Sequence, residues 1–313
     1  MTQPSVIQLE NRSCTLIVGN PGRPGTGIQI SNIGLQQGLD IWFQVRRSLK
    51  AKEPNTCDLR IRNLSNASRK ALESATTGTV TAITNAPSTT NASSPFVPVQ
   101  LQAGYVGGTS VIFSGQLRSA QTSTDGPDTV TELSTGDGDQ AMGLARSTGS
   151  FGVGSNPYII ATALLNDMGI GVGNIATVAS ILKAGKMFSG GVVLKGSSLD
   201  HLVDLAAGCT PQLEVTVQNG VAQWTQLGQP TGGSAYLLTS NTGLTGSPAI
   251  DTKGVLTMQT LLLPGLKPGS PIQVNAKYVQ GLFRIVSIET TGDTAGDEWG
   301  HQIEAKPYGL GAT

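Results

Sequence analysis

Aromatic side chains, charged side chains and cysteines are all scarce in this chain of 313 residues. Phe, Trp and Tyr make up 4% of the sequence and charged residues 13%. So few rings leave little material for the exposed aromatic rows on which sugars stack. The three cysteines, Cys14, Cys57 and Cys209, are odd in number and far apart, which argues against a disulfide framework and a zinc site. We therefore expect buried free thiols.

Net charge and long apolar runs are also missing. Lys plus Arg equals Asp plus Glu at 20 each, so the chain offers no bulk attraction to nucleic acid or to an anionic membrane. No charge-free apolar run reaches membrane-spanning length, and the first residues lack the pattern of a signal peptide. Thin charge fits burial in an assembly, since interface cores are depleted in charge, but ordinary compositional drift explains it equally well.

The motifs of the common enzyme classes are absent too. The segment around Lys186 fails as a phosphate-binding loop, because Met187 stands where Ser or Thr is needed. There is no G-x-S-x-G elbow. His201 and His301, the only two histidines, fit no metal-binding pattern, and we expect both at the surface or at a subunit contact. The sequence thus predicts no enzyme, no catalytic residue and no cofactor.

Two acidic, glycine-rich turns remain as candidates for a chemical site. One holds Asp137 and Asp139, and the other holds Asp293, Asp297 and Glu298. Neither continues into a calcium-loop pattern. We interpret both as solvated turns, with a weak divalent-cation site as the alternative, and predict no metal centre.

Glycine, by contrast, is abundant at 41 residues, and it is accompanied by many Thr, Ser, Asn and Gln. This mixture is typical of a β-rich protein with many turns. The clearest element is the stretch 39–65, LDIWFQVRRSLKAKEPNTCDLRIRNLS, where Ile41, Phe43 and Val45 alternate with polar residues and Leu59 and Ile61 do so on the return. A period of two on both arms predicts a β-hairpin buried on one face.

Further strands are expected at 97–105, 110–120 and 129–134, with a turn at 125–128 between the last two. The Thr/Ser-rich tract 73–98 cannot build much core by itself. We interpret it as a long loop or extended arm.

From Asn156 the apolar period changes to that of helices. The runs NPYIIATALLNDMG, NIATVASILKAG and SSLDHLVDLAAG each end on a glycine, where a left-handed helix cap is easiest. Ser197 and Asp200 resemble a capping box. The pair Asn219-Gly220 lies between two alternating runs and predicts a tight type I′ hairpin.

The remainder returns to strands, with a second long hairpin over 281–305 around the acidic turn. The predicted fold class is therefore mainly β (α+β), with two β domains flanking a small helical and hairpin insert. The expected domains are 1–148, which includes the loop 73–98, then 149–229 and 230–313.

Charge is distributed unevenly between the two long hairpins. From Asp40 to Lys70 the local net charge is +5, and from Gly281 to Glu304 it is −4. A basic strand face could track DNA. A complementary acidic hairpin in the same chain offers it a protein partner instead.

These residues carry a family resemblance. The phrase LDIWFQVRRSLKAKEPNTCDLRIRNLSNASRKAL, followed by VQLQAGYVGGTSVIFSGQLRSAQTSTDGPDTVTELSTGDGD, resembles the first domain of baseplate hub proteins of contractile-tailed bacteriophages. The segments SPAIDTKGVLTMQTLLLPGLKPGSPIQV and YVQGLFRIVSIETTGDTAGDEWGHQIEAKP resemble their last β domain. The likeness follows most of the chain in order, and the tract 72–97 and the short middle module depart from it.

The resemblance implies two tail-tube-like β-barrels and a structural role in the virion, in a tail baseplate assembled in the host cytoplasm. It implies a homotrimeric ring in which first and last barrels alternate, adapting a sixfold tail tube to a threefold spike. Its expected partners are itself, the spike protein, the tail tube and other baseplate proteins, and the tape measure protein. DNA would pass only in transit through the axial channel, and no membrane is involved.

The charge layout adds a hypothesis about the ring. We expect the basic hairpin to pack against the acidic hairpin of a neighbouring subunit, with charge setting the register and apolar strand faces carrying the affinity. The predicted interface residues are Arg46, Arg47, Lys50, Lys52, Arg60, Arg62, Glu289, Asp293, Asp297 and Glu298. The alternatives are another tail-ring component, such as a distal tail or tube protein, and a carbohydrate-binding module.

Overall fold

The computed structural model of the chain describes residues 11–19, 27–33, 38–76, 97–138, 145–185 and 191–308. Antiparallel β-strands dominate them, which confirms the predicted mainly β class. The strands are β1 (Arg12–Gly19), β2 (Gly27–Ser31), β3 (Ile41–Ser48), β4 (Asn55–Arg62), β5 (Pro98–Tyr105), β6 (Gly108–Asp125), β7 (Asp128–Asp137), β8 (Arg146–Phe151), β9 (Val192–Ser197), β10 (Leu213–Gln218), β11 (Val221–Gln226), β12 (Tyr236–Leu238), β13 (Leu244–Ile250), β14 (Leu256–Leu261), β15 (Pro271–Asn275), β16 (Gln280–Asp293) and β17 (Trp299–Pro307). The helices are α1 (Asn66–Thr76), α2 (Pro157–Met168), α3 (Ala179–Ala184), α4 (Ser198–Ala207) and the 3-10 helix η4 (Ile175–Val178).

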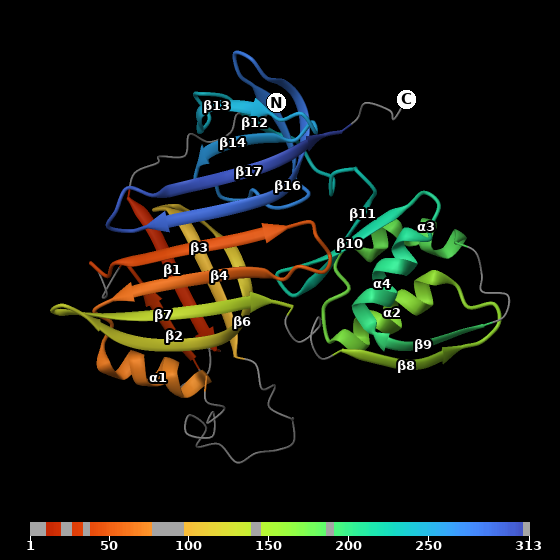
Figure 1. Ribbon diagram of the computed structural model, residues 1–313, viewed down its shortest axis with the longest axis horizontal. Helices are drawn as coiled ribbons and strands as arrows, with labels where there is room; N and C mark the ends of the chain where they lie inside the picture. The colour runs from red at the N-terminus through yellow and green to blue at the C-terminus, as the bar shows by residue number, and fades with distance from the viewer. Residues whose placement is uncertain are drawn as a thin grey trace.

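The buried apolar side chains form three clusters. The first lies inside the N-terminal unit, β1 to β7 with α1, and the third inside the C-terminal unit, β12 to β17. The second belongs to the insert of β8 to β11 and its helices, which lies to one side of both β units (Figure 1). Leu262 and Trp299 come from the C-terminal unit but pack in the first cluster, so the two β units share side chains.

The strands of both β units form one continuous sheet. Its order is β13-β14-β17-β16-β3-β4-β7-β6-β5-β1-β2, with β15 and β12 attached to β16 off this path. The joint between the units is the antiparallel pair β3·β16 (Figure 1).

The C-terminal unit repeats the strand order of the N-terminal one. In the N-terminal unit the strands follow one another in the order β3-β4-β7-β6-β5-β1. In the C-terminal unit the corresponding order is β13-β14-β17-β16-β15-β12. The one difference in direction is that β12 and β15 run parallel where β1 and β5 run antiparallel. The fold therefore contains an internal structural repeat.

The repeat holds at the level of single residues in the long hairpins β6–β7 and β16–β17. Each first strand has a bulge at the same place, between Leu117 and Ser119 in β6 and between Ile285 and Ser287 in β16. The residue just before each bulged stretch lies opposite a proline that begins the neighbouring strand. Gln116 of β6 faces Pro98 of β5, and Arg284 of β16 faces Pro271 of β15. Counting from the bulges, Ser119–Asp125 of β6 corresponds to Ser287–Asp293 of β16.

The insert confirms part of the predicted turn chemistry. Asn219 and Gly220 both have positive φ, 55° and 75°, as a type I′ hairpin requires. Gly169 caps α2 in the left-handed region with φ 65°. Gly185 and Gly208, by contrast, are not left-handed, so the prediction is wrong at these two helix ends.

Helix α1 was not predicted. It covers 66–76 and therefore takes the first residues of the tract 73–98, whose residues 77–96 lie outside the described ones. Ser65 Oγ accepts a hydrogen bond from Ser68 N, as a helix N-cap does. Leu72 is fully buried in the first core, so α1 contributes to the N-terminal unit.

Candidate functional site: the junction of the two charged hairpins

Strands β3 and β16 join the basic and acidic hairpins along seven residue pairs, from Ser48 opposite Ser287 to Trp42 opposite Asp293. Phe43 lies opposite Gly292, and a Cβ atom on Gly292 would come within 2.2 Å of the Phe43 ring. Phe43 also meets Trp299 edge to face, with ring centroids 5.5 Å apart. A glycine at 292 is what allows this aromatic ring to cross the joint.

On the solvent side of the joint the side chains form a polar network. Arg46 Nε lies 3.2 Å from Glu289 Oε2, and Gln44 Nε2 donates to Glu289 Oε1 at 2.6 Å. Arg46 Nη2 donates in turn to the Gln44 amide oxygen at 2.8 Å. Because Arg46 and Glu289 are about half exposed, their ion pair stabilises the joint by no more than about 1 kcal/mol.

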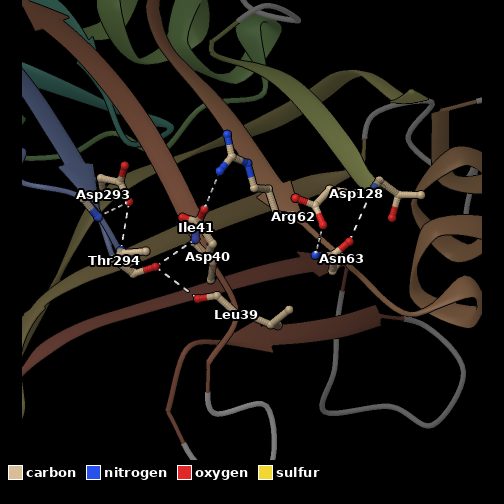
Figure 2. Close-up of polar contacts among 11 residues, drawn as sticks. Leu39, Asp40, Ile41, Arg62, Asn63, Asp128, Asp293 and Thr294 are labelled. Carbon is tan, nitrogen blue, oxygen red and sulfur yellow. Dashed lines mark hydrogen bonds and ion pairs between the residues drawn. The ribbon is translucent and has the colours of Figure 1, made fainter. Parts of the chain in front are cut away.

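The open end of the joint is closed by Thr294 (Figure 2). Its hydroxyl accepts from Ile41 N at 2.8 Å and donates to Leu39 O at 3.1 Å, while its backbone N–H donates to Ile41 O. Burial and the nearby Asp293 carboxylate raise the pKa of Asp40, and Arg62, 3.4 Å away, opposes them. This end is thus held mainly by hydrogen bonds to backbone.

The solvent-facing side of the sheet continues across both units as a polar surface. Arg60 stacks over the Trp42 ring, 5.1 Å from its centroid, and pairs with Glu132 at 3.0 Å. We call this surface the polar sheet face and define it by the outward side chains of β14, β17, β16, β3, β4 and β7: Gln259, Gln302, Glu304, Glu289, Thr291, Gln44, Arg46, Asp58, Arg60, Arg62, Glu132 and Ser134.

The two hairpins meet within one chain, which corrects the expectation that the acidic partner belongs to a neighbouring subunit. Charge complementarity identifies which surfaces fit, but it carries no information on whether they share a chain. Arg60, Arg62 and Arg46 all have acidic partners in the same molecule. A role of these residues in contacts between subunits stays a prediction.

Arg47 differs from the other predicted interface residues, because it is only 5% exposed. It follows Ile41, Phe43 and Val45 on the core side of β3, and Arg46 follows Trp42 and Gln44 on the other side. The side chain of Arg47 therefore lies inside the chain, and a subunit-interface role for Arg47 stays a prediction. The alternation that predicted the hairpin already places Arg46 and Arg47 on opposite faces.

The remaining predicted residues have local or long-range partners. Lys50 pairs with Glu53 in its own turn, and Lys52 reaches Asp200 of α4 in the insert at 2.6 Å. Asp293 accepts from the backbone of Ala295 and Gly296, so it caps its own turn. Glu298 accepts from Trp42 Nε1 at 3.3 Å, and Asp297 receives Arg12 on its backbone carbonyl.

Arg12 is the important residue that the sequence analysis missed. From the start of β1 its guanidinium donates to the carbonyls of Asp293, Gly296 and Asp297, and it lies over the Trp299 ring. The sheet of the N-terminal unit therefore curls until its far strand β1 meets the acidic turn. No local sequence signal identifies Arg12, since its partners lie more than 280 residues away.

His301 is buried, contrary to the expectation of a surface or contact histidine. It lies on the core side of β17, where Nε2 accepts from Leu263 N at 3.0 Å and Nδ1 is 2.8 Å from Thr290 Oγ1. Burial lowers the pKa of His301 to about 4. A neutral imidazole with both nitrogens engaged serves structure rather than proton transfer.

Other chemistries find no support in the part of the chain that the structure describes. No three His, Cys, Asp or Glu side chains there gather as a metal site, and Asp139 lies outside it. All three cysteines are buried and free, as predicted. Trp224 and Trp299 are buried as well, which removes the exposed aromatic row that a carbohydrate-binding module needs. Among these residues no helix has the length and apolarity to cross a membrane.

Comparison with known proteins gives a consistent set of relatives. The family model described as baseplate hub gp41 matches residues 25–282. The 43 kDa tail protein of prophage MuSo2 from Shewanella oneidensis superposes with a TM-score of 0.59 at 13% identity, over 95% of this chain and 98% of that one. A tail protein from Neisseria meningitidis MC58 gives 0.57 at 10% identity, over 96% and 98%.

A third structure, the half-lidded Francisella PdpA-VgrG complex, contains a chain that superposes with a TM-score of 0.50 at 8% identity. The match covers 96% of this chain and 59% of that one. At such identities these likenesses show a shared fold. Among curated protein sequences, none matches the chain.

Proposed function

Since the chain belongs to the baseplate hub gp41 family, a family of structural proteins of phage tails, we propose that it is the central hub of its baseplate. In this role three copies form a ring of six β units that adapts a sixfold tail tube to a threefold spike. The ring leaves an axial channel for the tape measure protein and, on ejection, for DNA.

The observation that carries this proposal is the internal repeat, in which two strand edges lack the partner that their counterparts have. The bulged half of β16 pairs with β3, whereas the corresponding stretch of β6, Ser119–Asp125, pairs among the described residues only with β7. The strand that corresponds to β3 is β13, which pairs only with β14. Each chain thus carries one completed joint and the two halves of a second joint among its described residues.

Exposure at matched positions supports the same conclusion. Thr290 and Gly292 are buried at the joint with β3. Of their counterparts in β6, Thr122 is half-buried and Thr124 is exposed. Unpaired strand edges template pairing with another chain. We infer that β13 of one copy pairs with Ser119–Asp125 of the next, which repeats the joint β3·β16 around the ring.

The correspondence also predicts a register. Gln44 lies opposite Thr291 in the existing joint. Matching positions place Ala249 of one copy opposite Ser123 of the next, and Ile250 opposite Thr122. Pro248 lies in the irregular part of β13 and lacks an N–H, so the pairing has two short stretches on either side of it.

The polar sheet face suits the wall of the channel. Its arginines, Arg46, Arg60 and Arg62, are each neutralised by an acidic neighbour. A wall without free positive charge does not retain DNA phosphates. Two β units in one chain also favour a hub over a tube subunit built from a single unit.

The test is cross-linking of a double variant, Ser123→Cys with Ala249→Cys, with a short bismaleimide. The native cysteines are buried, so the introduced pair reports alone. We expect covalent dimers and trimers on a denaturing gel, and a trimer by native mass spectrometry, alone or with the spike protein of the same genome.

A matched control carries Ser123→Cys with Ser155→Cys, which is in a turn of the insert. Trimers that do not cross-link through 123 and 249 would contradict the proposed joint. A chain that stays monomeric with and without the spike protein would contradict the ring itself.

A further inference from the structure

A cavity of about 820 Å³ opens where the N-terminal unit, the insert and the C-terminal unit meet. Each part contributes to its lining, so it exists only in the assembled chain. Ligand sites occur preferentially at such junctions, and this volume is in their usual range. The side chains used below are Arg47, Val111, Val221, Tyr236, Leu266 and Lys267.

The lining contains a buried cation with an unused donor. Arg47 is 5% exposed, and its Nη2 donates to Leu266 O at 3.0 Å. Its Nε is buried and has no hydrogen-bond partner among the described residues. Burial lowers the pKa of Arg47 to about 10, so the guanidinium is still charged at neutral pH. An unmade hydrogen bond on a buried charge is costly, and an acceptor that reaches the guanidinium from the cavity offsets part of that cost.

None of the described residues that line the cavity is acidic, and the acid whose charge acts on Arg47 is already engaged. Asp137, whose charge acts on Arg47, accepts from Asn219 N at 2.6 Å, Gly220 N at 2.8 Å and Asn55 Nδ2 at 3.1 Å. Lys267 adds a second positive charge to the lining. The cavity therefore presents an excess of positive charge.

The exposed part of the lining includes three large apolar side chains. Val111, Val221 and Tyr236 are about 40% exposed, at 39%, 41% and 41%. An inorganic anion would leave these groups in water, and a nucleic acid strand would bring more phosphates than two cations can neutralise. A carboxylate with apolar neighbours on one short chain matches both features.

We propose that this junction cavity is a docking site for a short segment of another protein that carries a glutamate or aspartate between apolar side chains. The carboxylate accepts from the Arg47 guanidinium, and the flanking side chains cover Val111, Val221 and Tyr236. Such a segment contacts all three parts of the chain, so its binding ties the insert to both β units. This site is independent of the joint between β6 and β13.

The test uses methyl NMR of the full-length protein, which works for a monomer or a trimer. The probes are blocked pentapeptides with a central Glu flanked by Leu, Val or Phe, each compared with its Gln counterpart. We expect the Glu peptides to shift the methyl signals of Val111, Val221 and Leu266 and to leave Val193, at the far edge of the insert, unchanged. The Gln peptides should bind about tenfold more weakly or worse.

Two variants complete the test. Arg47→Met should abolish the preference for Glu over Gln, and Arg47→Lys should retain part of it, because it keeps the charge but loses the planar donors. Lys306→Gln removes an exposed cation outside the cavity and should change nothing. Equal binding of Glu and Gln peptides to the wild type, or no shift of the cavity methyls by any Glu peptide, would overturn the proposal whether or not the Arg47 variants fold.

Discussion

Polar side chains at two core-facing strand positions lie close to the joint of the two β units. Arg47 and His301 both occupy positions that the alternation of their strands assigns to the core. Each is buried, and each engages backbone of the segment 263–266. A buried polar group that is hydrogen-bonded in this way specifies one arrangement of its neighbours, because other arrangements leave it unpaired.

His301 makes stability depend on pH in a defined window. Its folded pKa, about 4, lies below the ordinary value of 6.5, so the unfolded chain takes up the proton first. The contribution of His301 to the free energy of unfolding is fully present above pH 6.5. It is lost as the pH falls towards 4, and the loss is on the order of 3 kcal/mol at most. Urea unfolding between these pH values measures it. In His301→Gln we expect a flatter profile, and an unchanged slope would show that another group is responsible.

Gly292 makes a second prediction at this scale. Gly292→Ala adds a methyl group where the Phe43 ring already lies, and we expect it to reduce the free energy of unfolding by about 1–3 kcal/mol. Gly152→Ala is the control, because nothing lies within 4 Å of its added Cβ. Urea denaturation of both variants makes the comparison, and equal stability of the two would mean that Phe43 can move aside at little cost.

Among the elements, the strands with clear alternation were predictable and those defined by distant partners were not. The hairpins β3–β4, β6–β7, β10–β11 and β16–β17 all form where period-two runs flank a turn. Strand β6 is longer than expected, ending at Asp125, because a bulge lets it continue past β5 to pair with β7. Helix α1 was missed because one buried leucine gives too weak an apolar period to recognise.

The insert's hairpin docks onto the N-terminal unit mainly through polar contacts. Asp137 accepts both backbone N–H groups of the Asn219-Gly220 turn, and Gln218 Nε2 donates to Ser48 O at 2.7 Å. On the other side, Arg284 Nη1 meets Glu214 at 2.6 Å. These contacts hold the insert against both β units while the insert keeps its own core.

Asp137→Asn tests this docking. The asparagine amide has one acceptor oxygen and one donor NH₂ in place of the two carboxylate oxygens. At least one of the backbone N–H groups of Asn219 and Gly220 therefore loses its acceptor. We expect a loss of about 1–3 kcal/mol and faster hydrogen exchange at Asn219 and Gly220. Asp125→Asn, in the exposed turn of β6–β7, is the control and should change neither. Unaltered exchange in Asp137→Asn would mean that packing, and not the carboxylate, holds the turn.

On the scale of the whole molecule, the sequence predicted the order of two β units around an insert but not how the units join. Alternation and turn residues report on neighbours along the chain. The pair β3·β16 joins residues about 240 positions apart, and nothing local specifies it. Trp299 and Leu262 in the first core were unpredictable for the same reason.

The separate cores predict different behaviour of isolated fragments. The residues 145–228 contain the whole second cluster, and we expect this fragment to fold alone with dispersed NMR signals. The residues 11–138 lack β16, Leu262 and Trp299 and should aggregate or stay unfolded. A soluble, cooperatively unfolding fragment 11–138 would show that the shared side chains are dispensable.

The joint β3·β16 also imposes an order on synthesis. While the ribosome is still translating the insert, β3 can already pair with β4, but its other edge has no partner strand. Phe43 also lacks its contact with Trp299 at this stage. The open edge of β3 persists until β16 has left the exit tunnel, and exposed strand edges invite pairing with other nascent chains. The intervening 145–228 can meanwhile settle on its own. The nascent chain is therefore vulnerable until β16 has been synthesised, and a chaperone that covers β3 during this interval would raise the yield of native protein.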